Sequence, residues 1–241
     1  MIQVLVIIVP LAGAFLLPLI QLIHGKATKP AIIMLGTASF FLNLIAAYSG
    51  WHDPGIHLTG GWPAGIGIAL VNDPLSAPFL SLAALGFGAT LICSFSKNEE
   101  IPWKFYILFF LSWASVNGIT GTGDLFNLYV FYEIFSVSAY LLVAFSTMEW
   151  QATEAGFKYL VFGTVGAMFF LLGTTYMFML TGLLNLGAIS DALAMTPGLP
   201  LYVPGGCFLI ALSIKAGAFP SHFWLPDAHS SARTPVSALL S

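Results

Sequence analysis

The chain has 241 residues, of which 58% are hydrophobic and 7% are charged, and its mean hydropathy is +0.92. Soluble domains carry about 25% charged residues, so this composition excludes a soluble enzyme. The net charge of −3 excludes a nucleic-acid-binding protein, which needs a basic surface. Both cysteines, Cys93 and Cys207, lie in apolar runs, so we expect neither a disulfide framework nor a thiolate metal site. The sequence therefore indicates an integral membrane protein.

Seven apolar stretches approach the roughly 20 residues that a helix needs to cross a bilayer. They cover residues 2–23, 30–48, 73–95, 103–121, 123–146, 157–181 and 203–221. The first lacks the basic region and cleavage site of a signal peptide, so we expect it to be retained. An eighth helix begins near Thr234 and is too short to cross. We predict an all-α polytopic membrane protein with about seven to eight transmembrane helices and irregular stretches at 51–57 and 190–204.

The basic residues predict the orientation, because Lys and Arg concentrate in cytoplasmic loops. They flank alternate connections, whereas the loops after the second, fourth and sixth spans hold none. The residues concerned are Lys26, Lys29, Lys97, Lys104, Lys158 and Arg233. This pattern puts the amino terminus outside. It puts four acidic residues inside, namely Glu99, Glu100, Glu149 and Glu154.

Two charged residues lie within predicted spans, Glu133 in the fifth and Lys215 in the seventh. A charge near the bilayer centre costs about 2.5 to 3.5 kcal/mol, and such residues usually mark ion paths. Both helices run in the same direction, so the two side chains can meet as a pair. At ~4 Å and an effective dielectric near 20, the pair attracts by about 4 kcal/mol. Separating the pair would release the lysine's proton, although a purely structural ion pair remains an alternative.

The chain after Lys215 offers a continuation of this path. Pro220 is expected to break the seventh helix one turn after Lys215, and broken helices are frequent at transport sites. His222 and His229 are candidate relays because histidine titrates nearest neutral pH. Alternatively, His222 is an interfacial residue beside Trp224, and His229 is an exposed residue near a helix start. Their spacing, with Asp227 between them, matches no strong metal-ligand pattern, so we expect no metal site.

Several residues have a structural interpretation. Lys158 follows Glu154 by four residues, which favours a surface ion pair. Asp124 is expected to cap the fifth helix, and small residues such as Gly163 to allow close helix packing. Five hydroxyl residues could hold water between the charged sites, and the sequence does not select among them. They are Ser112, Ser115, Thr120, Ser136 and Ser138.

Two motifs in this order resemble a known family. Residues 123–133 read GDLFNLYVFYE, and residues 219–229 read FPSHFWLPDAH, followed by PVSALL from Pro235. They resemble the antiporter-like subunits shared by Mrp-type cation/proton antiporters, membrane-bound hydrogenases and respiratory complex I. The GDLFN form points most toward the Mrp D-type subunit and its hydrogenase-linked relatives. The resemblance covers about residues 70 to 241.

The resemblance implies roles for particular residues. Glu133 matches the family's fifth-helix glutamate, Lys215 its lysine in the broken helix, and Lys158 its sixth-helix lysine. His222 and His229 match the histidines before the eighth helix. The family fold has two inverted five-helix repeats, so we divide this chain into N-terminal helices and an external loop at 1–70 and an antiporter-like domain at 71–241. Two departures are the absence of the second repeat and Arg233 in place of a usual proline.

The leading hypothesis is a proton-translocating, or Na⁺/H⁺-exchanging, subunit of a multi-subunit complex in a prokaryotic inner membrane. Its expected partners are other membrane subunits, including a chain that supplies the second repeat. Any redox chemistry belongs to those partners, because the sequence carries no cofactor motif. The alternatives are a non-conducting structural half-subunit and, with less support, a self-contained transporter.

Overall fold

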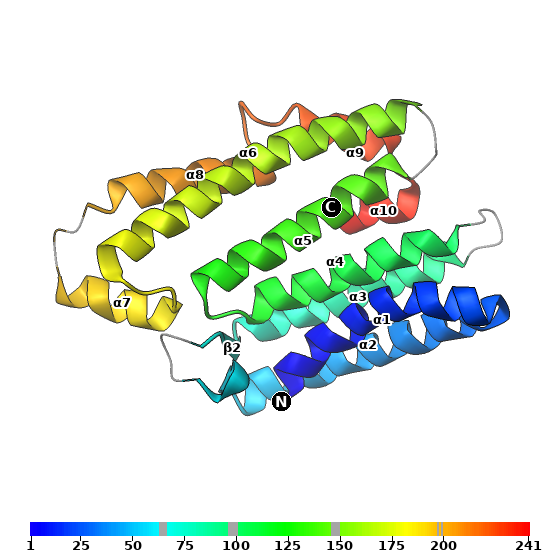
Figure 1. Ribbon diagram of the computed structural model, residues 1–241, viewed down its shortest axis with the longest axis horizontal. Helices are drawn as coiled ribbons and strands as arrows, with labels where there is room; N and C mark the ends of the chain where they lie inside the picture. The colour runs from blue at the N-terminus through cyan, green and yellow to red at the C-terminus, as the bar shows by residue number, and fades with distance from the viewer. Residues whose placement is uncertain (63–66, 96–100, 146–149, 197, 199) are drawn as a thin grey trace.

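The computed structural model describes residues 1–241 except 63–66, 96–100, 146–149, 197 and 199. Its helices follow one another along nearly the whole chain (Figure 1). They are α1 (Ile2–Ile23), α2 (Thr28–His52), α3 (Ser76–Ser94), α4 (Trp103–Gly121), α5 (Leu125–Ala144), α6 (Trp150–Thr181), α7 (Leu186–Met195), α8 (Tyr202–Lys215), α9 (Trp224–Ser231) and α10 (Thr234–Leu240). The all-α prediction is confirmed. Lys97, Glu99, Glu100 and Glu149, on which part of the predicted orientation rests, lie outside the described residues.

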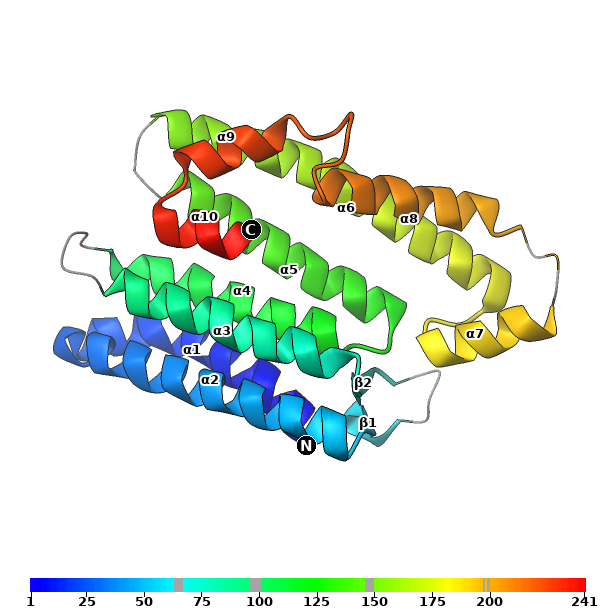
Figure 2. The ribbon, with the colours of Figure 1, turned by 180° about the vertical axis from the view of Figure 1, so that it is seen from behind.

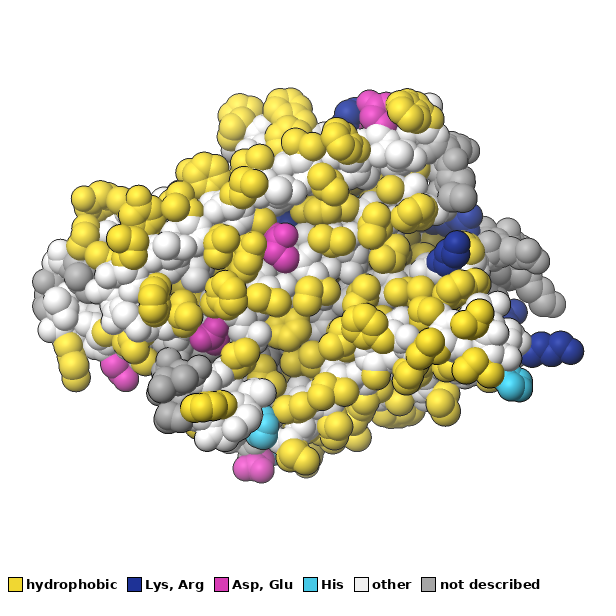
Figure 3. Space-filling model, in the orientation of Figure 1, with side chains coloured by type: hydrophobic (Ala, Val, Ile, Leu, Met, Phe, Trp, Pro, Cys, Tyr) yellow, Lys and Arg dark blue, Asp and Glu magenta, His cyan; other side chains and the backbone are white. Residues whose placement is uncertain are grey.

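The long helices pack side by side in two groups. Helices α1 to α4 form one group, α6 and α8 form the other, and α5 lies between them, against α4 and α6 (Figures 1 and 2). Five of the described helices are long and apolar enough to cross a membrane: α1, α2 with its preceding turn, α3, α5 and α6. The face seen in Figure 3 is largely apolar, and many large hydrophobic side chains are exposed on the long helices, as lipid contact requires. The chain is a multi-pass membrane protein.

Helix α4 matches its predicted bounds and is not among these five described helices, and its side chains pack against other helices. Phe109, Phe110 and Trp113 are completely buried there. The amide groups of Asn117 and Asn43 contact each other at 2.8–2.9 Å, and Asn117 also donates to the carbonyl of Val6. Because these polar side chains are satisfied by α1 and α2, they do not face lipid.

The two stretches expected to be irregular contain regular structure. Strands β1 (Gly55–Leu58) and β2 (Ala69–Asn72) pair antiparallel, with Gly55 opposite Asn72. The second stretch overlaps α7, whose first turn is capped by the side chain of Asn185. The backbone of Leu186 donates to the carbonyl of Gly123, which ties α7 to the start of α5. These long-range contacts explain why local hydropathy did not reveal either element.

Helix α8 ends earlier than predicted. The seventh span was expected to continue to residue 221 with a break at Pro220, but the helix stops at Lys215. Gly217 has a φ of 63°, its N–H donates to Ile214, and the N–H of Ala218 donates to Ser213. These two bonds form a Schellman motif that ends the helix at a left-handed glycine. Lys215 is therefore the last helical residue.

Candidate functional site

One face of α5 carries the polar residues of the candidate site. Asp124 caps the helix by accepting a 2.8 Å hydrogen bond from the N–H of Asn127, as predicted. Glu133, Ser136 and Tyr140 then follow at spacings of three and four residues, which places them on one stripe. Ser136 and Tyr140 are buried, and Glu133 is half-buried. The sequence spacing contained this signal, although charge alone had singled out only Glu133.

Lys215 reaches this stripe from the end of α8. Its ammonium Nζ donates to Ser136 Oγ and, at 3.1 Å, to the hydroxyl of Tyr140. The ammonium also lies 4.7 Å from the ring centre of Tyr132, which is a cation–π distance. Ser136 is thus the hydroxyl residue, among the five candidates, that contacts a charged residue of the site.

Among the described residues, Glu133 and Lys215 do not form the direct ion pair that the sequence led us to expect. Glu133 Oε1 is buried and, among the described residues, has no hydrogen-bond partner. The reason is positional: Lys215, as the last residue of α8, faces Ser136, one turn along α5 from Glu133. The Lys215 ammonium therefore bonds to hydroxyl groups of α5 about one helical turn away from Glu133.

Tyr140 is held by α6. A Cβ atom at Gly163 would overlap the Tyr140 hydroxyl, so the missing side chain makes room for it. The Tyr140 ring meets Tyr159 edge-on at 4.5 Å, and Tyr159 stacks on Trp224 at 4.0 Å. The indole N–H of Trp224 donates to the carbonyl of Ile214 at 2.9 Å. The aromatic residues therefore connect the hydroxyl contact to the end of α8.

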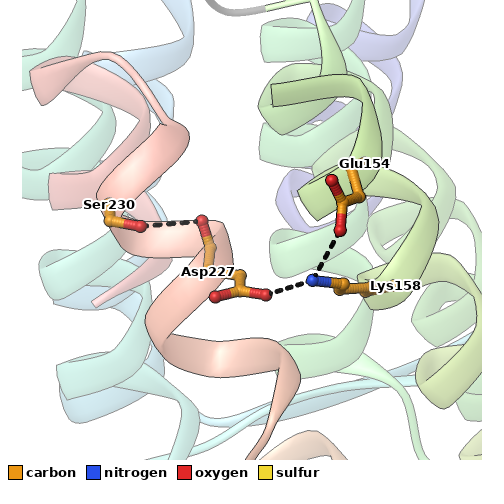
Figure 4. Close-up of polar contacts among 4 residues, drawn as sticks. All are labelled: Glu154, Lys158, Asp227 and Ser230. Atoms are coloured by element: carbon orange, nitrogen blue, oxygen red, sulfur yellow. Dashed lines mark hydrogen bonds and ion pairs between the residues drawn. The ribbon is translucent and has the colours of Figure 1, made fainter. Parts of the chain in front are cut away.

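Lys158 lies in a second polar cluster, at the junction of α6 and α9 (Figure 4). It forms the predicted ion pair with Glu154 at 2.9 Å and a further one with Asp227 at 2.7 Å. All three side chains are between two-fifths and one-half exposed. The sequence did not predict the contact with Asp227, because 69 residues separate the two.

The two histidines have different surroundings. Among the described residues, His222 Nδ1 is buried without a hydrogen-bond partner, and the ring stacks on Phe223 at 4.8 Å. His229 lies in the last turn of α9, rather than near a helix start, and its Nδ1 contacts Ser237 Oγ of α10 at 2.9 Å. The structure places His222 near the broken segment and His229 at the connection to α10. No group of metal-ligating side chains gathers in the described ranges.

A family model of the transmembrane region, described as NADH:quinone oxidoreductase/Mrp antiporter, matches residues 122–241. The chain belongs to this antiporter-like family. The matched segment begins just before α5 and includes α6, α8, α9 and α10. It therefore contains both polar clusters and both histidines, in the part of the chain where the two motifs lie.

Two curated relatives and one solved structure illustrate the range of the family. NADH-quinone oxidoreductase subunit N of Desulforudis audaxviator is 35% identical over 98% of this chain and 48% of its own length. The D-type subunit of the Na⁺/H⁺ antiporter of Alkalihalophilus pseudofirmus is 33% identical over 75% of this chain and 37% of its own. A chain of the membrane-bound sulfane sulfur reductase, an archaeal respiratory membrane complex, superposes with a TM-score of 0.89 at 31% identity, over 98% of this chain and 49% of that one.

This antiporter-like chain spans about half or less of the length of these relatives. The similarity reaches almost its whole length, so it includes α1 and α2 as well as the region from residue 70 onward where the motifs suggested it. The relatives belong to complexes with different chemistry, which is consistent with a shared membrane subunit.

Proposed function

We propose that the chain is a proton-translocating subunit of a multi-subunit membrane complex, either an Mrp-type antiporter or a respiratory complex. The observation that supports this most directly is the Lys215 ammonium, which lies at the broken end of α8 against the hydroxyl groups of α5. A cation within the helix bundle is costly and is retained where ions move. Na⁺ is a second candidate ion, because one relative is a Na⁺/H⁺ antiporter subunit.

In this proposal Lys215 carries the proton and Glu133 is its alternating carboxylate partner. A buried carboxylate oxygen without a hydrogen bond is energetically unfavourable when ionised. Binding either the ammonium or a proton would relieve this cost at Glu133. His222 lies next to the break after Lys215 and is the next candidate group. Lys158 and His229 lie at the α6–α9–α10 junction, where a proton would reach or leave the site.

The proposed setting is a prokaryotic inner membrane with the amino terminus outside. Met1 lies at the same end as the β1–β2 hairpin, and Lys26 and Lys29 lie at the opposite end of α1 and α2 (Figure 2). Under the positive-inside rule the lysine end faces the cytoplasm. Other integral membrane subunits are the proposed partners, because the structural relatives come from multi-subunit complexes.

The test is ion transport in inverted membrane vesicles that carry the whole complex. We would compare wild type with Glu133→Ala and Lys215→Ala, and with the exposed control variants Asp191→Ala and Lys104→Ala. We expect both site variants to lose transport while the complex still assembles, and both controls to retain it. Unchanged transport in both site variants would refute the relay and favour the alternative function, a structural subunit that bridges its neighbours.

A further inference from the structure

Among the described residues, the Lys215 ammonium bonds to two hydroxyl groups and to no carboxylate. A lysine ammonium offers three N–H donors. Two are taken by Ser136 and Tyr140, and the π face of Tyr132 attracts the remaining positive charge. Charge-assisted bonds of this kind are stronger than bonds between neutral groups. The hydroxyl groups therefore hold the protonated form of the lysine while Glu133 is not bonded to it.

We propose that Ser136 and Tyr140 form a second resting site for protonated Lys215, so that the lysine alternates between this hydroxyl pair and Glu133. Both are positioning residues of the proposed proton path, and the inference rests on that proposed function. In this inference, the two neutral side chains keep the ammonium bound while it is separated from the carboxylate.

The two proposed partners of the ammonium lie about one helical turn apart on α5. Glu133 and Ser136 are three residues apart on α5, so the rise of the helix separates them by about 4.5 Å along its axis. A lysine side chain spans this distance by rotation about its own bonds. The Ser136 hydroxyl donates its proton to the carbonyl of Tyr132 at 2.7 Å, so its lone pairs are free to accept from the ammonium.

Contacts with α6 fix the position of the Tyr140 side chain. Its hydroxyl occupies the space left by Gly163, and its ring packs on Tyr159. Tyr159 in turn stacks on Trp224, whose N–H bonds to Ile214, the residue before Lys215. The same set of contacts therefore positions both the acceptor and the backbone that carries the donor.

The experiment compares Tyr140→Phe, Ser136→Ala and the double variant in vesicles that carry the whole complex. Tyr176→Phe is the matched control, because it removes an exposed phenol hydroxyl of α6 that lies outside this set of contacts. Losing one bond to a charged group is expected to slow transport roughly tenfold, and the double variant should be slower still. Amounts of assembled complex and unfolding temperatures should match the control.

The pH profile separates a positioning role from a packing role. Among the described residues, the ionisable groups of α5 facing Lys215 are Glu133, Tyr132 and Tyr140, with Tyr159 of α6 behind Tyr140. Without the hydroxyls, the ammonium is held less well, so the alkaline limb of transport should move to lower pH by about one unit. Tyr176→Phe should leave this limb unchanged.

The outcomes for the two proposals differ. If Lys215→Ala abolishes transport while the double variant keeps the wild-type rate and pH profile, the resting site is refuted and the proton path stands. If Lys215→Ala itself transports normally, the proposed function fails, and the resting site fails with it.

Discussion

Adding one methyl group at Gly163 tests the packing on which the site depends. In Gly163→Ala the new Cβ would overlap the Tyr140 hydroxyl and its ring carbon Cζ, and would lie 2.9 Å from Cε1. These atoms belong to one rigid phenol group, which cannot relieve the overlap by bending. The phenol ring is itself packed on Tyr159. Overpacking of this kind typically costs about 1 to 3 kcal/mol. Each kcal/mol corresponds to about 2 to 4 °C in Tm for a domain of this size.

The matched control is Gly86→Ala in α3, where a Cβ would meet nothing within 4 Å. Replacing a helical glycine by alanine at an open position should stabilise by about 0.5 to 1 kcal/mol. The assay is thermal unfolding of the purified complex, together with transport in vesicles. We expect Gly163→Ala to unfold at lower temperature and to transport more slowly, because Tyr140 is displaced from Lys215. Equal unfolding temperatures and equal transport in the two variants would show that Tyr140 does not occupy this space.

Three further predictions concern the fold around the site. Asp227→Asn should leave the unfolding temperature unchanged, because its ion pair with Lys158 is exposed to solvent. The same variant should lower transport if Lys158 belongs to the proton path. A large drop in Tm would contradict the expectation for stability. Asn117→Ala should destabilise the complex by about 1 to 2 kcal/mol through its lost contact with Asn43, measured by thermal unfolding, and an unchanged Tm would refute the contact. Gly217→Ala should cost about 1 to 2 kcal/mol because its φ is 63°, and wild-type stability would argue against the Schellman end of α8.

Local pattern was sufficient for much of the fold. The predicted ranges 2–23 and 103–121 coincide with α1 and α4, because apolar runs of this length have few alternatives to a helix in a membrane. The cap at Asp124 and the ion pair of Glu154 with Lys158 were also predicted, since both join residues within one turn. The two charges within predicted spans, Glu133 and Lys215, were evident from their positions in apolar stretches.

Contacts between distant segments could not be predicted in this way. The end of α8 at Lys215 depends on Gly217, whereas Pro220 was the more conspicuous sequence signal. The roles of Glu133, Lys158 and the histidines in transport stay predictions that the proposed vesicle experiments test.

The sequence by itself determined that this is a helical membrane protein with a carboxylate and a lysine inside the bundle. Only the tertiary structure decided what the lysine touches: Ser136 and Tyr140 in place of Glu133. The physical reason is that hydropathy and periodicity specify which face of each helix is polar. The depth and rotation of one helix against another follow from side-chain packing, here the fit of Tyr140 against Gly163.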